Sequence, residues 1–167
     1  MKKFAFTAVI FAVCCGFAIS DTPPLVESSK SRGVPISIGV DAGTSMNSGD
    51  GYAFRFGIHG DYAVLKSLKI GLQADCNMDF KDTITLDPSV YIKYYIPVRS
   101  SVFFPFLKGS VGASFLWYDE SLVLATLLGI EAGFSIQLKH FYIEPGVSFG
   151  YPYFWSASVG LGCYFGR

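Results

Sequence analysis

The chain has 167 residues, enough for one domain with a core of its own. Apolar residues make up 51% and aromatic residues 17%, whereas charged residues reach only 16% and the formal net charge is zero. This balance excludes a basic surface for nucleic acid, and an ordinary soluble surface would carry more charge. Because no spacing typical of a phosphate-binding loop, a dinucleotide-binding turn or a zinc finger occurs, we predict no cofactor and no metal site.

The N-terminus is typical of an export signal. The basic segment MKK precedes the apolar run FAFTAVIFAVCCGFAI, and Ala18-Ile19-Ser20 supplies small residues before a cleavage site. We expect residues 1–20 to be a signal peptide and residues 21–33 to be a polar linker. An N-terminal membrane anchor and a lipoprotein cleavage at Cys14-Cys15 are the alternatives.

From residue 34 onward, apolar and polar residues alternate with the period of a strand that has one face of each kind. The segment KIGLQADCNMDF, for example, separates into I, L, A, C, M, F on one face and K, G, Q, D, N, D on the other. Eight such segments are predicted, in chain order, over residues 34–45, 52–64, 68–80, 84–98, 102–118, 121–138, 141–152 and 155–166. Each is long enough for a tilted strand to cross a bilayer.

The connections between these segments are short and alternate in character. Those at residues 66–67, 99–100 and 139–140 are basic, whereas SMNSGDG, KDT and DES are polar and mostly acidic. Two kinds of turn in alternation are typical of an up-and-down meander, in which successive hairpins lie at opposite ends. An even number of strands then places both chain ends beside the basic turns, on the periplasmic side.

Side-chain volume decides which face points inward. The interior of an eight-stranded barrel is only just wide enough for side chains. The polar set is rich in glycine and serine and fits that space, whereas the bulky apolar set does not. Only lipid makes an outward belt of Phe, Ile, Leu and Val acceptable. We therefore predict an all-β, eight-stranded antiparallel up-and-down transmembrane β-barrel over residues 34–167.

Aromatic residues gather toward the ends of the predicted strands. The candidate girdle consists of Tyr52, Phe80, Trp117, Tyr151 and Trp155 near the acidic turns, and of Tyr62, Tyr94, Phe103, Phe141 and Phe165 near the basic turns. Aromatic girdles mark the two membrane–water interfaces of such barrels. The alternative is the general enrichment of aromatic residues in strands.

The signal peptide, the eight segments, the stretches GDYAVLKSLKIGLQAD, YYIPVRSSVFFPFLKGSVGAS and FYIEPGVSFGYP, and the closing pair Tyr164-Phe165 resemble the small outer-membrane barrels of the OmpX/OmpW/OmpA-transmembrane type. The resemblance spans residues 34–167 and implies export through the periplasm to the outer membrane of a diderm bacterium. It also implies lipid surroundings and the barrel-assembly machinery as a partner during insertion. Two features depart from this type: Gly166-Arg167 follows the terminal Phe, and the surface turns are very short.

The inward-facing set carries charges of both signs. They are Asp41, Asp61, Asp75, Asp79, Asp87, Glu131 and Glu144 against Arg55, Lys69, Lys93 and Lys108. Charges in so narrow a lumen must be paired and hydrogen-bonded. We expect an ion-pair network that plugs the lumen, made of Arg55, Lys93, Lys108, Glu131 and Glu144. Its centre would be Lys108, Glu131 and Glu144, on three successive strands.

Three classes of function remain open. A plugged lumen and short turns favour a monomeric barrel with a structural or surface-interaction role, which meets external ligands only at its turns. The resemblance implies, as an alternative, a narrow channel for small or hydrophobic solutes. A barrel enzyme is the third class. His59 and Asp61 share an inward face, but no serine elbow accompanies them, so we predict no catalytic residue.

Overall fold

The computed structural model describes residues 36–47, 51–79, 83–98, 100, 102–118, 121–138 and 140–165. The expected signal peptide, the polar linker, Phe80 and Gly166-Arg167 lie outside these residues. Among the described residues, no helix is long and apolar enough to span a membrane.

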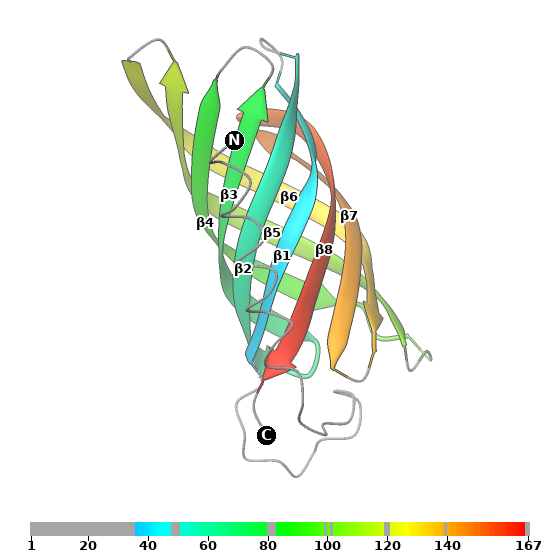
Figure 1. Ribbon diagram of the computed structural model, residues 1–167. Coiled ribbons are helices and arrows are strands. Elements are labelled where there is room, and N and C mark those ends of the chain that lie inside the picture. The colour runs from blue at the N-terminus through cyan, green and yellow to red at the C-terminus, as the bar shows by residue number, and fades with distance from the viewer. Residues whose placement is uncertain are drawn as a thin grey trace.

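Eight strands follow one another in a closed antiparallel barrel, as the sequence predicts (Figure 1). They are β1 (Ile36–Asn47), β2 (Gly51–Leu65), β3 (Leu68–Asp79), β4 (Ile84–Tyr95), β5 (Phe103–Tyr118), β6 (Ser121–Gln137), β7 (Phe141–Tyr151) and β8 (Tyr153–Phe165). The barrel closes between β1 and β8, where Ile36 pairs with Phe165. Both ends of the described chain therefore lie at one rim, the lower rim of Figure 1, and the β1–β2, β3–β4, β5–β6 and β7–β8 connections lie at the upper rim.

The strand register fixes the width of the barrel. A path that starts at Ile36 and moves to the paired residue on each next strand, first to Tyr62, goes once around the barrel. It returns to β1 at Met46, ten residues beyond its start (46 − 36). This stagger tilts the strands against the barrel axis. With eight strands, it leaves an interior that side chains fill.

The polar face of each strand points inward, and β4 is the clearest case. Its side chains alternate between buried and exposed at every position. Asp87 and Lys93 are buried, whereas Val90 is 50% and Ile92 57% exposed. This is the reverse of a soluble barrel, and it places the apolar side chains of the strands on the outer surface.

The candidate girdle residues lie at the two ends of that apolar surface. At the upper rim, Tyr52, Trp117 and Tyr151 are exposed, and Trp155 is half-buried against the ring of Tyr52. At the lower rim, the exposed members are Tyr62, Tyr94, Phe103 and Phe141, and Phe165 is half-buried. Both rims therefore carry outward aromatic rings.

The upper rim is stepped. Strands β5 and β6 are the longest, with 16 and 17 residues. Pairing between β6 and β7 begins only at Leu128, opposite Tyr151, so residues 121–127 pair with β5 alone. The β5–β6 hairpin accordingly stands above its neighbours at the upper left of Figure 1. The turns are short, as expected, but this hairpin extends the barrel wall beyond them.

Candidate functional site: the barrel lumen

The inward side chains form two hydrogen-bonded clusters, one above the other. The lower cluster consists of Ser37, Asp61, Lys69, Tyr91, Lys93, Tyr95, Tyr142 and Glu144. The upper cluster consists of Arg55, Gln73, Asp75, Asn77, Asp87, Lys108, Glu131, Tyr153 and Ser156. Strand alternation brings all these residues inside, because each lies on the polar face of its strand.

Lys69 is one of the two buried lysines of the lower cluster. Its Nζ lies 2.8 Å from Asp61 Oδ1 and donates a hydrogen bond of 2.9 Å to Ser37 Oγ, which in turn donates to Asp61. The same ammonium lies 5.0–5.5 Å from the ring centres of Tyr95, Tyr142 and Tyr164. Aromatic rings and one carboxylate therefore replace the water around this charge.

Lys93 links the two carboxylates of the lower cluster. Its Nζ lies 2.7 Å from Glu144 Oε2 and 3.8 Å from Asp61 Oδ2. Each carboxylate also accepts a hydrogen bond from a tyrosine hydroxyl: Tyr95 donates to Glu144 at 2.8 Å, and Tyr91 donates to Asp61 at 3.0 Å. The lower cluster is thus an ion-pair network with hydrogen bonds on both carboxylates.

His59 connects the lower cluster to the upper one through Asp41, which also contacts Arg55. Its Nε2 lies 2.8 Å from the Tyr142 hydroxyl, and its Nδ1 lies 3.4 Å from Asp41 Oδ2. The sequence placed His59 beside Asp61 on one strand face, but the side-chain contacts are with Asp41 of β1 and Tyr142 of β7. Both ring nitrogens therefore face protein groups, the buried Tyr142 and the half-buried Asp41.

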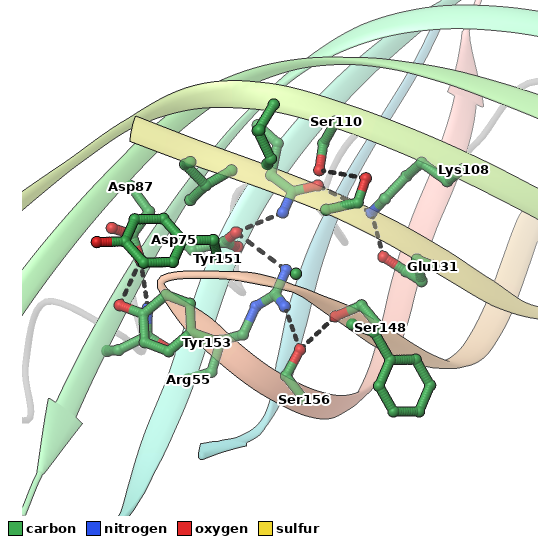
Figure 2. A pocket seen from close by; sticks show the side chains of 17 residues that line it. Arg55, Asp75, Asp87, Lys108, Ser110, Glu131, Ser148, Tyr151, Tyr153 and Ser156 are labelled. Carbon is green, nitrogen blue, oxygen red and sulfur yellow. Dashed lines mark hydrogen bonds and ion pairs between the residues drawn. The ribbon is translucent and has the colours of Figure 1, made fainter. Parts of the chain in front are cut away.

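Arg55 organises the upper cluster. Its Nη2 bonds Asp75 Oδ2 at 2.9 Å, its Nη1 donates to Ser156 Oγ at 2.9 Å, and its Nε lies 3.6 Å from Asp41 Oδ1. Figure 2 shows the guanidinium between Asp75 and Ser156, reaching across the lumen from β2.

Lys108 forms the second ion pair of the upper cluster. Its Nζ lies 2.5 Å from Glu131 Oε2 and donates to Gln73 Oε1 at 2.9 Å (Figure 2). Gln73 in turn donates to Asp75, so the two ion pairs of the upper cluster are joined through one amide.

Asp87 lies nearest the upper rim and is held by neutral donors. Asn77 Nδ2 donates to Asp87 Oδ2 at 2.6 Å, and the Tyr153 hydroxyl donates to it at 2.8 Å (Figure 2). Within the part of the chain that the structure describes, Asp87 takes part in no ion pair.

Two small cavities lie in the lumen. The upper cavity has a volume of about 50 Å³ and is lined by upper-cluster residues, and the lower cavity has about 20 Å³. Arg55, Lys108 and Glu131 line both cavities and so form a partition between them. Since one water needs roughly 10–15 Å³ of such space, each cavity has room for only a few water molecules.

The five residues expected to form the lumen network all line the lower cavity: Arg55, Lys93, Lys108, Glu131 and Glu144. Their pairing differs from the expected one. Lys108 bonds Glu131, but Glu144 bonds Lys93. The carboxylate bonded to Arg55 comes from β3.

Sequence reasoning missed several residues that complete the clusters. Tyr142, Tyr153 and Gln73 supply hydrogen bonds to charged or titratable groups, but none was assigned to the network. A signal was available for Tyr142, because it lies two residues before Glu144 and so shares its inward face.

Neither a protein-family model nor a curated protein sequence matches this chain. Its fold is similar to the N-terminal β-barrel domain of Pseudomonas aeruginosa OprF, with a TM-score of 0.61, 14% identity, and coverage of 78% of this chain and 97% of that chain. Neisserial surface protein A (NspA) gives a TM-score of 0.58 at 15% identity, covering 78% of this chain and 95% of that one. Outer membrane protein OprG from Pseudomonas aeruginosa gives 0.53 at 16% identity, covering 81% and 97%. At these identities the likeness concerns the fold: this chain has the fold of the small eight-stranded β-barrels of bacterial outer membranes.

Proposed function

We propose that this chain is a monomeric integral outer-membrane barrel with a plugged lumen, which acts structurally or through its external surface and catalyses no reaction. The observation that carries the proposal is the partition of Arg55, Lys108 and Glu131 between two cavities of about 50 and 20 Å³. A pore needs a continuous aqueous path, and here charged side chains, each bonded to lumen partners, lie between the two cavities.

The degree of burial supports the plug. The paired side chains of Lys93 and Glu144 are 3% and 5% exposed, and those of Lys108 and Glu131 are each 11% exposed. Each of these groups lies against a partner of opposite sign, and separating the partners would leave a buried charge uncompensated.

The outer surface supports lipid as the surroundings of the barrel. Every strand contributes exposed large apolar side chains, among them Ile38, Ile58, Leu72, Val111 and Ile130. A continuous apolar surface of this kind suits hydrocarbon and would be unstable in water. External ligands and partners would then meet only the upper rim, where Trp117, Tyr151 and Trp155 lie.

A narrow channel is the second candidate. It is favoured by the two cavities, which lie in series and share three lining residues. Joining them would require Arg55, Lys108 and Glu131 to move apart. Against an enzyme, both ring nitrogens of His59 already face Asp41 and Tyr142.

Conductance in planar bilayers tests the proposal. We expect the folded wild-type protein to show no steady single-channel current, because the partition interrupts the water path. Steady currents that change with Glu131→Gln, but not with the outward-facing control Val90→Ala, would establish the channel and contradict the plug.

A further inference from the structure

Four carboxylates lie in a single row of the strand register. Asp41 of β1 pairs with Gly57 of β2, which pairs with Asp75 of β3, and Asp75 pairs with Asp87 of β4. On the other side of Asp41, Gly160 of β8 pairs with Glu144 of β7. This acidic row runs Glu144, Gly160, Asp41, Gly57, Asp75, Asp87. Arg55, Lys69, Lys93 and Lys108, the lumen cations among the described residues, all lie outside this row.

The centre of the acidic row has one more negative charge than its neighbours balance. Glu144 is paired with Lys93, but Asp41 and Asp75 share the single guanidinium of Arg55. Among the described residues, the other ion-pair partner of either is His59, 3.4 Å from Asp41. The charge of Lys108 also attracts both aspartates, but its direct ion pair is with Glu131. The Oδ1 atoms of both aspartates are buried and have no hydrogen-bond partner, and their side chains are only 9% and 6% exposed.

Gly57 lets these two carboxylates approach each other. A Cβ on Gly57 would lie 2.1 Å from Asp75 Oδ1 and 2.7 Å from Asp41 Oδ2. The two oxygens can therefore be no farther apart than 4.8 Å, the sum of these distances. A calcium ion binds each oxygen at about 2.3–2.6 Å, so one ion between them spans up to about 5 Å. Two like charges at this separation in a buried site repel each other, and either a bound cation or a shared proton relieves that repulsion.

We propose that Asp41 and Asp75 bind one hard cation of the size of Ca²⁺ or Na⁺ above Gly57. Asp75 lines the upper cavity and Asp41 the lower one, so the cation would lie at the partition and complete its coordination with water from the cavities. The described residues include no group of three or more His, Cys, Asp or Glu that could hold a metal ion. Two carboxylate ligands therefore make this a weak site, unlike a site enclosed by protein ligands.

Cation-dependent stability tests the site, whether or not the lumen conducts. Thermal unfolding of the detergent-folded full chain is followed by tryptophan fluorescence in CaCl₂, NaCl and choline chloride at equal ionic strength. A cation present at ten times its dissociation constant should lower the unfolded-to-folded ratio about elevenfold. Ca²⁺ or Na⁺ should therefore raise the midpoint above that in choline chloride, because choline is too large for the gap.

Two variants should abolish this shift, and one should keep it. Asp41→Asn removes one ligand, and Gly57→Ala places a methyl group between the two carboxylates. Asp61→Asn is the matched control, because Lys69 and Tyr91 already occupy the oxygens of Asp61. A shift that persists in Asp41→Asn and Gly57→Ala would overturn the proposal.

Direct binding provides a test that needs no variant. Equilibrium dialysis of the folded wild-type protein against radioactive calcium and sodium should find close to one bound cation per chain, beyond a detergent-only control. Absence of saturable binding of either ion would overturn the site. An unfolding midpoint that changes with pH but not with the choice of cation would also overturn the site. In that case a proton shared by Asp41 and Asp75 would balance their charge.

Discussion

At the scale of single residues, the lumen depends on partners that are charged and almost completely enclosed. The Lys108–Glu131 contact of 2.5 Å is the clearest case, because it joins neighbouring strands at a directly opposed pair of positions. Removing one partner of such a pair leaves the other charge buried and unpaired. The resulting loss of folding stability is larger than the net stability that the intact pair contributes.

Lys108→Met should therefore destabilise the folded barrel by about 3–5 kcal/mol, and the double variant Lys108→Met/Glu131→Leu should recover most of that loss. Urea unfolding in detergent micelles measures both values. The outward-facing variant Val90→Ala serves as the control for a change in side-chain volume alone. A Lys108→Met variant as stable as the wild type would show that Glu131 is not dependent on this lysine.

Close packing around glycine is a second effect at this scale. A Cβ on the inward-facing Gly162 would lie 2.2 Å from the Tyr142 ring, whereas a Cβ on the outward-facing Gly109 would meet no atom within 4 Å. Gly162→Ala should cost about 1–3 kcal/mol through overpacking. Gly109→Ala is the matched control and should be nearly neutral in the same unfolding experiment. Equal costs at the two positions would contradict the placement of Tyr142.

At the scale of the strand, the β5–β6 hairpin is the element that differs from the rest of the barrel. Residues 121–127 of β6 pair on one side only, and Leu122 and Leu124 are 57% and 65% exposed. Leu124 lies four residues beyond Leu128, the residue of β6 that pairs with the girdle residue Tyr151. This part of the hairpin therefore rises past the apolar surface of β7.

An arginine substitution tests whether Leu124 lies outside the hydrocarbon layer that surrounds Val90. Val90→Arg, at the middle of the outer face of β4, should cost about 2–4 kcal/mol in lipid vesicles, whereas Leu124→Arg should cost only about 0–1 kcal/mol. The two side chains have similar exposure, 50% and 65%, so exposure does not explain the difference. A Leu124→Arg variant as unstable as Val90→Arg would place the hairpin within the hydrocarbon layer.

At the scale of the whole molecule, closure of the barrel gives β1 and β8 a neighbour on both sides. A closed barrel leaves few free edges from which detergent could begin to unfold it. The refolded chain should therefore migrate differently on gels with and without boiling, and only the boiled form should run as an unfolded chain of 18.2 kDa. Identical migration of refolded and boiled samples would contradict a closed barrel.

The sequence by itself determined the eight strands, their inward faces and the rim at which the chain ends meet. All of these follow from local rules: alternation with period two assigns each side chain to a face, and short turns make consecutive strands neighbours. The predicted strand limits accordingly lie within three residues of those in the structure. The polar interior followed from volume, since glycine and serine fit a narrow lumen and phenylalanine does not.

Only the tertiary structure decided which charges meet. Lys93 and Glu144 lie 51 residues apart, on strands β4 and β7, which face each other across the lumen without being neighbours. Their contact depends on the ten-residue stagger and on the reach of two long side chains, and neither is encoded in a local pattern. The same holds for Asp41 and Asp75, which come together only because the register places Gly57 between them. Alternation fixes the direction in which a side chain points, but the stagger of the closed barrel fixes the side chain that it meets.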